Sequence, residues 1–424
     1  MPNPIIPGKE CQHRLTTKRS RPGPILHEVV SHDTAAIVHS KRLVSNTMLT
    51  KVRLAVVGVV ALAASLPVAA QGLRAGVIVN STPLADAPAG AQAYRIRYRS
   101  ADTFGRPVVV SGAVIVPRGQ SPAGGRPVVV WAHGASGIAE NCGLSDKPGF
   151  YELIAGLQPL LAAGYVVVAP DYQGLGNPGP HPMLVGNAAA HSVIDAVRAV
   201  RDMRGVNASD RYAVFGESLG AFSALWAGTL SARYAPELTL VGVAAAAPPT
   251  DLKANLTGRS NVAVRAFLTA YTASSWEQVY NLPLTTVVKP RTAILIRNLA
   301  KNCVSLDGFK LRTKLGMLRL AGQLKNVDLA ASPRWATLME QNSVKAAALS
   351  LPVFVQQGGE DVIVAPGVTE AFVARLCRYN RNVRYIVTAG GDHVSAGKTT
   401  APDAVAWIGD RFAGRRPPSD CRKL

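Results

Sequence analysis

Short apolar segments separated by helical patterns recur along the sequence after residue 90, and they constrain the fold more than any other feature. The later segments are continuous runs of apolar and β-branched residues, which is typical of strands buried on both faces of a parallel sheet. Stretches between them, such as Ala188–Met203 and Ala221–Tyr234, have the apolar spacing of helices. Strands that alternate with helices predict an α/β fold with a mostly parallel sheet.

The predicted sheet has eight strands, of which the first two lie close together and are expected to pair antiparallel. The eight segments are Tyr94–Arg99, Val108–Val116, Pro127–Trp131, Tyr165–Ala169, Arg211–Phe215, Leu240–Ala245, Leu351–Gln356 and Val383–Thr388.

The strand pattern is interrupted between Pro248 and about Ser350, where helical patterns replace it. The four helical segments are Asn261–Ser275, Thr292–Asn302, Phe309–Leu324 and Pro333–Leu349. We therefore expect residues 248–350 to form a helical cap or lid inserted into a core of residues 71–247 and 351–424. An ordinary helical subdomain without a gating role fits the same pattern.

Residues 48–70 have the features of an export signal. Basic Lys51 and Arg53 follow Met48, an uncharged apolar run comes next, and the segment ends in Val68-Ala69-Ala70. This order predicts a signal peptide, because the run is short and rich in Ala and Gly for a membrane span. Residues 1–47 are then a non-structural extension, and we hypothesise that Met48 is the true start. The mature protein is expected to be secreted or periplasmic.

The formal net charge is +20, of which residues 1–47 carry +4 and residues 48–70 carry +2. The remaining positive charge is spread over the mature chain without a dense Lys/Arg run or a nucleic-acid motif. We expect no nucleic-acid partner. A basic soluble surface explains the charge, and so does a surface that adheres to anionic membranes or wall polymers.

Four cysteines fall in the mature part, at Cys142, Cys303, Cys377 and Cys421. Because export favours oxidation, an even number of cysteines predicts two disulfides, with three connectivities open. None of the four has the CxxC spacing of a zinc or redox site, and we expect neither a metal nor an organic cofactor.

The sequence Gly216-Glu217-Ser218-Leu219-Gly220 lies between the strand 211–215 and a helical run from Ala221. Such a strand–turn–helix elbow exposes a serine hydroxyl, and its glycines allow a crowded turn. The Leu219 N–H at the start of the helix is placed to bind an oxyanion. A GxSxG motif occurs by chance in a chain rich in glycine, and it is the context that identifies Ser218 as a candidate nucleophile.

A serine nucleophile needs a base, and the mature part has histidines only at His133, His181, His191 and His393. His393 follows the last predicted strand, at the carboxyl edge where active sites of open α/β sheets lie. His191 lies within a helical pattern and His181 in a loop rich in Pro and Gly. His133 follows the strand 127–131, where an oxyanion loop is expected, and its neighbour Ala135 is the second candidate donor.

The third member of the triad is expected to be Asp361, with Glu360 as the alternative. Both follow the strand 351–356 in Gln357-Gly358-Gly359-Glu360-Asp361. The order Ser218, Asp361, His393 agrees with α/β-hydrolases rather than with chymotrypsin or subtilisin. This triad predicts cleavage of carboxylic esters through an acyl-enzyme on Ser218. Asp392, beside the base, is either a surface acid or a residue that tunes His393.

The chain resembles the secretory lipase family of the α/β-hydrolases over about residues 90–415. The resemblance rests on His133–Cys142, Ala169–Gly176, Asp195–Ala199, Gly216–Gly220, Gly358–Asp361 and Gly391–His393.

The resemblance implies a helical cap after the sixth strand and the disulfides Cys142–Cys303 and Cys377–Cys421. The family often has Tyr or His before the nucleophile, where this chain has Glu217. That difference affects the expected substrate preference and leaves the expected reaction class unchanged.

Three other functions fit parts of the sequence. An esterase for polysaccharide-linked esters of cell walls would use the same chemistry. Peptidases of the same fold often carry a propeller or a paired-Glu motif, and the sequence shows neither. A non-catalytic binding module would not require Ser, Asp and His at these three positions. The expected partner is therefore an ester, either a lipid or a small ester.

Overall fold

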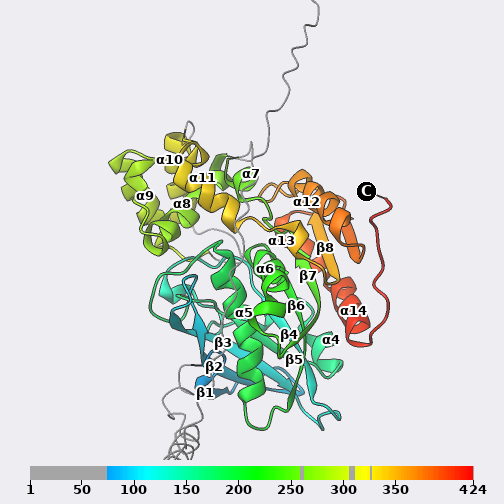
Figure 1. The fold of residues 1–424 in the computed structure, drawn as a ribbon. Helices are drawn as coiled ribbons and strands as arrows, with labels where there is room; N and C mark the ends of the chain where they lie inside the picture. Colours follow the sequence, from blue (N-terminus) through cyan, green and yellow to red (C-terminus); the bar gives the residue numbers. More distant parts are fainter. Residues whose placement is uncertain (1–73, 258–261, 305–310, 325–326, 424) are drawn as a thin grey trace, which may run out of the picture. The chain divides into compact units, whose positions relative to one another are not determined.

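The strands form a single sheet in the order β1-β2-β3-β5-β4-β6-β7-β8-β9 (Figure 1). This computed structural model describes residues 74–257, 262–304, 311–324 and 327–423, which belong to one compact unit spanning residues 67–424. The extension 1–47 and the predicted signal peptide 48–70 lie outside the described residues.

Six adjacent strands are parallel, and the antiparallel pairs lie at the end of the sheet that contains β1. The strands are β1 (Ile78–Leu84), β2 (Ala91–Ala101), β3 (Pro107–Pro117), β4 (Arg126–Ala132), β5 (Val166–Pro170), β6 (Ala208–Glu217), β7 (Thr239–Ala246), β8 (Val353–Gly358) and β9 (Val383–Thr388). The α/β-hydrolase fold and the mostly parallel sheet are as predicted.

The sheet has nine strands, one more than the eight predicted. The additional strand, β1, is an edge strand with the sequence IVNSTPL and has no buried residue. Its position depends on backbone pairing with β2 and not on burial of apolar side chains, so the sequence has no hydrophobic pattern there. Pro83 within it is also typical of an edge strand.

Helices cover both faces of the sheet because the central strands alternate side chains between two cores. In β4, Val128 and Val130 belong to one core, and Val129 and Trp131 to the other. The first core includes α5 (Gly186–Asp202), α6 (Leu219–Tyr234) and α12 (Pro366–Tyr379). The second includes α3 (Phe150–Leu153), α4 (Leu157–Ala162) and α14 (Ala401–Phe412).

Between β7 and β8 the described residues form helices and no strand, as the sequence predicts. These helices, seen above the sheet in Figure 1, are α7 (Leu252–Thr257), α8 (Val262–Val279), α9 (Pro290–Ala300), α10 (Leu311–Leu324) and α11 (Pro333–Asn342). We call them the cap helices. Their buried faces join the first core through residues such as Trp276 and Trp335, whose rings stack.

Two disulfides connect the four cysteines as the family resemblance implies. Cys142 pairs with Cys303 and Cys377 pairs with Cys421. The first joins the loop after β4 to the segment that follows α9, and the second joins α12 to the C-terminal tail. Among the described residues, no helix combines the length and the apolar character needed to cross a bilayer.

Candidate active site

Ser218 stands in a sharp turn between β6 and α6, as the motif predicts. Its φ is 54° and its ψ −118°, a strained conformation for a residue with a side chain. A β-carbon on Gly220 would lie 1.8 Å from the Ala132 carbonyl oxygen, and one on Gly216 would lie 2.2 Å from the Gly220 oxygen. Only glycine fits at these two positions, so the motif creates the crowded elbow that presents Ser218.

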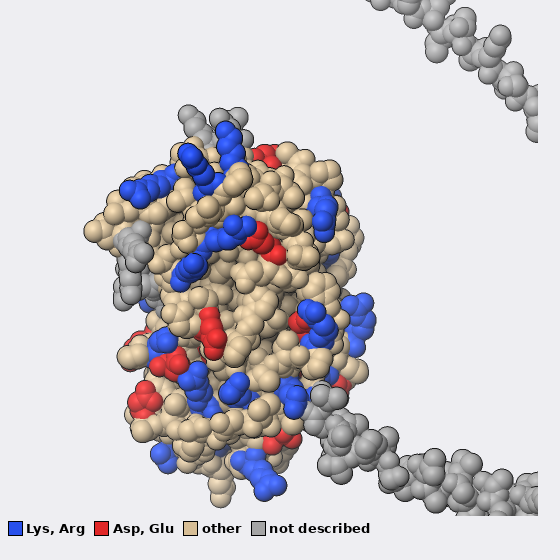
Figure 2. All heavy atoms as spheres, turned by 90° about the vertical axis from the view of Figure 1, so that its left-hand side faces the viewer, with Lys and Arg blue, Asp and Glu red and all other residues tan. Residues whose placement is uncertain are grey.

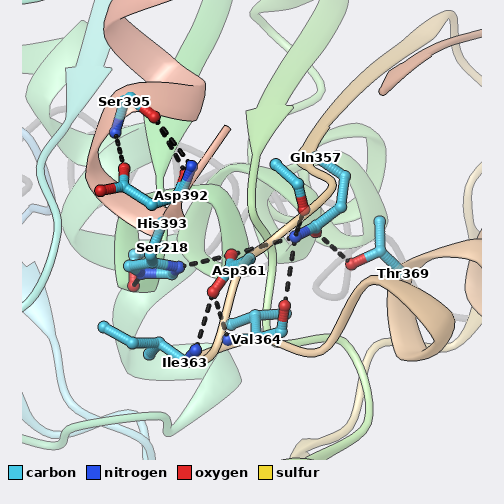
Figure 3. A network of polar contacts seen from close by, with 10 residues as sticks. Ser218, Gln357, Asp361, Ile363, Val364, Thr369, Asp392, His393 and Ser395 are labelled. Atoms are coloured by element: carbon cyan, nitrogen blue, oxygen red, sulfur yellow. Dashed lines mark hydrogen bonds and ion pairs between the residues drawn. The ribbon is translucent and has the colours of Figure 1, made fainter. Parts of the chain in front are cut away.

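The structure brings Ser218, Asp361 and His393 together from three separate segments (Figure 3). The His393 Nε2 atom lies 2.9 Å from the Ser218 Oγ atom. The other ring nitrogen, Nδ1, lies 2.7 Å from Oδ2 of Asp361. His393 therefore bridges a hydroxyl and a carboxylate, an arrangement that lets a serine be deprotonated as it attacks.

The Asp361 carboxyl is buried and held by several donors at once. Its Oδ1 accepts from the N–H groups of Ile363, at 2.8 Å, and Val364, at 2.9 Å. Its Oδ2 accepts from Gln357 Nε2 at 3.0 Å. The alternative acid, Glu360, is exposed, and its backbone N–H donates to the Gly391 carbonyl oxygen. Asp361 is thus the acid that contacts His393.

Gln357 is a site residue that the sequence analysis did not identify. It is buried at the end of β8, and its Oε1 accepts a hydrogen bond of 2.6 Å from Thr369 Oγ1. Thr369 lies on α12, so this contact fixes the amide that supports Asp361 (Figure 3). A polar residue at the end of an otherwise apolar strand was the available signal.

Asp392 starts the short helix α13 (His393–Thr399), whose first residue is His393. Its Oδ1 accepts from the Ser395 N–H at 2.7 Å, and the Ser395 hydroxyl lies 2.9 Å from the Asp392 N–H. This reciprocal capping box, visible in Figure 3, orients the helix that carries His393. The hydrogen bonds from Ser395 lower the pKa of Asp392, so the cap stays ionised.

The loop after β4 lies against the elbow, as expected for an oxyanion loop. A β-carbon on Gly134 would lie 3.7 Å from Ser218 Cβ, and Ala135 and Leu219 line the same cavity as Ser218. The Tyr172 hydroxyl, in the segment that follows β5, donates to the His133 carbonyl oxygen at 3.0 Å and holds this loop. Burial lowers the pKa of His133, which keeps that ring neutral.

The remaining histidines hold loops in place. His191 Nδ1 lies 3.1 Å from the Ala101 carbonyl oxygen, and its ring stacks on Tyr234. His181 is buried, with Nδ1 2.8 Å from the Gln173 carbonyl oxygen. Both rings contact other residues, whereas His393 lies within hydrogen-bond distance of the Ser218 hydroxyl.

A cavity of about 190 Å³ opens beside Ser218 and His393. Its walls come from both the core and the cap helices, and they are mainly apolar. The apolar lining includes Trp131, Leu144, Leu153, Met183, Leu184, Leu256, Phe267, Leu268, Val304, Ile363, Val364 and Val394. Among the described residues, the ionisable side chains of the lining are Glu217, Lys398 and the two histidines His133 and His393.

The sheet topology, the elbow after β6 and the Ser–Asp–His order define the chain as an α/β-hydrolase. The sequence profile of the secretory lipase family matches residues 151–420, and the chain belongs to that family. It is therefore a carboxylic ester hydrolase, and an exported protein, which agrees with its two disulfides.

Two curated relatives illustrate the similarity. Lipase A of Arthroderma benhamiae is 25% identical over 353 residues, which cover 78% of this chain and 73% of that protein. A secreted triacylglycerol lipase of Malassezia globosa is 27% identical over 284 residues, covering 63% of this chain and 58% of that protein.

Two solved structures share the fold. Candida antarctica lipase A in its closed state has a TM-score of 0.67 at 18% identity, covering 84% of this chain and 86% of that one. The rice cell wall degrading esterase LipA from Xanthomonas oryzae has a TM-score of 0.64 at 19% identity, covering 81% and 100%.

Proposed function

We propose that Ser218, Asp361 and His393 are the catalytic triad of this ester hydrolase. The observation that carries the proposal is the pair of short contacts made by the His393 ring, with Nε2 2.9 Å from Ser218 Oγ and Nδ1 2.7 Å from Asp361 Oδ2. Because three N–H donors already converge on the Asp361 carboxyl, its oxygens act as acceptors and we assign the proton between the two groups to His393 Nδ1. Nε2 is then free to accept the proton of Ser218.

The reaction proceeds in two halves. His393 takes the Ser218 proton as Oγ attacks the ester carbonyl, and the protonated ring then gives that proton to the leaving alcohol. Water, deprotonated by the same ring, attacks the acyl-enzyme, and the ring returns that proton to Ser218 Oγ as the acid is released. We propose that the N–H groups of Leu219 and Ala135 bind the oxyanion of both tetrahedral intermediates.

The substrate we propose is an ester with an apolar acyl group, presented at a lipid surface. The apolar cavity beside Ser218 supports the first part. The second part is supported by α10, where Leu311, Leu315 and Leu318 are 73%, 53% and 63% exposed. These leucines lie on one helical face with exposed Lys314 and Arg319 beside them, and α10 contains no acidic residue. Lys and Arg side chains also gather over the cap end of the face in Figure 2.

The related triacylglycerol lipase of Malassezia globosa supports a lipid ester, whereas the Xanthomonas oryzae esterase shares only the fold. A cell-wall ester and a peptide remain the alternative substrates for the same site, and the experiment below separates them.

The test is hydrolysis of p-nitrophenyl esters, from acetate to palmitate, by residues 71–424 and by a Ser218→Ala variant. We expect turnover that is highest for medium or long acyl chains, with a loss of about 10³-fold or more in the variant. Activity that survives in Ser218→Ala would remove Ser218 from the mechanism. A folded protein inactive on every ester would be assayed next with feruloyl and peptide substrates.

A further inference from the structure

The carboxyl group of Glu217 is a buried charge-bearing group beside the nucleophile that the mechanism above does not use. Glu217 is the last residue of β6 and directly precedes Ser218. Its Oε1 atom is buried and has no hydrogen-bond partner among the described residues. An unsatisfied buried oxygen costs stability, so its retention beside an active site calls for a functional explanation.

The carboxyl group packs directly on the helix that carries His393. A β-carbon on Gly397 would lie 2.4 Å from Cδ and 2.7 Å from Oε1 of Glu217. Gly397 comes four residues after His393 in α13, so the two lie on the same face of the helix, one turn apart. The missing side chain at position 397 therefore creates the space that brings the Glu217 carboxyl close to the catalytic ring.

The other ionisable groups of this cavity are His133, from the loop after β4, and His393 and Lys398, from α13. Burial raises the pKa of Glu217 to about 7, although Lys398 and then His393 act in the opposite direction. His133 is buried, and its lowered pKa keeps it neutral. The two groups whose positive charge would interact with an ionised Glu217, Lys398 and His393, thus both lie on α13.

We propose that Glu217 is a positioning residue for His393, whose ionised carboxylate stabilises the imidazolium formed when Ser218 attacks. The proposal rests on the triad function proposed above. The carboxylate takes no proton from the substrate, because the Ser218 proton goes to His393 and then to the alcohol. It attracts the positive charge that His393 carries in both transition states, and the neutral carboxylic acid does not.

The test compares kcat and KM between pH 5.5 and 9 for the wild type and Glu217→Gln, with a soluble short-chain ester. Gln is isosteric with the protonated acid, so the variant should fold like the wild type does in acid. We expect equal kcat at low pH and an advantage of about tenfold for the wild type above pH 8, the effect of one charge at close range. KM should change less than twofold.

Two further variants separate this role from a structural one. Lys398→Gln removes the cation that favours ionisation of Glu217. The pH at which kcat rises as Glu217 ionises should therefore be higher in this variant than in the wild type. Glu217→Asp keeps an ionisable carboxyl group and should keep part of the rise in kcat with pH. Melting temperatures would identify a variant that merely unfolds.

Parallel pH profiles for the wild type and Glu217→Gln, or a change confined to KM, would overturn the inference and leave the triad intact. A wild type no more active than Ser218→Ala would instead remove the triad, and this inference with it.

Discussion

The carboxyl of Asp361 shows how single residues set the chemistry of this site. It accepts from two backbone N–H groups, from Gln357 and from His393. Gln357 is itself held by Thr369, so the contacts extend from α12 to the Ser218 hydroxyl. The tautomer of His393 is thus fixed by a carboxylate that cannot rotate without losing several hydrogen bonds.

We predict that Asp361→Asn lowers kcat by about 10³–10⁴-fold while the protein stays folded, because an amide does not hold the required imidazole tautomer. Ester hydrolysis and circular dichroism would measure both effects. Glu360→Gln is the matched control, since this neighbouring acid is exposed, and it should retain wild-type kcat. The reverse ranking of the two variants would assign the role to Glu360.

At the scale of elements, α10 has one apolar face that is buried in the core and a second whose leucines are exposed. Met317, Leu320 and Leu324 are buried in the first core, so the helix is already anchored without its outer leucines. Leu315 and Leu318 are exposed on the opposite side, next to basic side chains. An apolar stripe flanked by Lys and Arg is typical of helices that lie at a lipid interface.

We predict that Leu315→Ser with Leu318→Ser lowers binding to vesicles of anionic phospholipid by about tenfold, because apolar area that would enter the bilayer is lost. Cosedimentation would measure the bound fraction. Activity on a soluble short-chain ester should stay within about twofold, since neither residue lines the cavity. Equal binding by the double variant and the wild type would exclude α10 as the contact.

For the whole molecule, the core and the cap helices are joined by specific polar contacts as well as by apolar packing. Ser275 of α8 donates to the His181 carbonyl oxygen at 2.6 Å, and Trp276 donates to that of Met183 at 3.0 Å. Asn342, at the end of α11, accepts from the Gly186 N–H at 2.9 Å. The loop around His181 is therefore a joint between the two parts.

This joint should weaken in acid. Burial lowers the pKa of His181 to about 4, well below the ordinary value of 6.5, so the folded state resists its protonation. The stabilisation is complete above pH 6.5 and is lost as the pH falls towards 4, an effect of about 3 kcal/mol. Urea denaturation from pH 4 to 8 would measure the free energy of unfolding of the wild type and of His181→Leu. The difference between the two proteins should shrink by that amount as the pH falls.

Both proteins contain Glu217, whose pKa is raised in the folded state, so its effect on the free energy of unfolding cancels in the difference between them. The comparison with His181→Leu therefore isolates this histidine. A His191→Gln protein, altered at a histidine outside the joint, should keep the acid dependence of the wild type. A wild-type advantage that does not change with pH would show that His181 is protonated as readily in the folded protein as in the unfolded one.

The sequence predicted the central strands and the three residues that the fold brings into contact, because both depend on local patterns. Ser218, Asp361 and His393 follow strands whose burial gives continuous apolar runs, and parallel strands bring their carboxyl ends to one edge. The pattern did not reveal β1, which depends on pairing with β2 alone. It also missed the support that Gln357 gives to Asp361 and the contact between Glu217 and Gly397, because both depend on side-chain packing between distant segments.

The two disulfides pair the mature cysteines in the order in which they occur in the chain. A polypeptide exported from its N-terminal end presents Cys142 first and Cys303 next, so the first bridge can close before Cys377 emerges. Within residues 71–424, each cysteine then meets its native partner before any wrong one, although the first bridge spans 161 residues. Oxidative folding during translocation would thus need no disulfide isomerase, whereas refolding of the reduced chain of residues 71–424 exposes its four thiols at once and allows all three pairings.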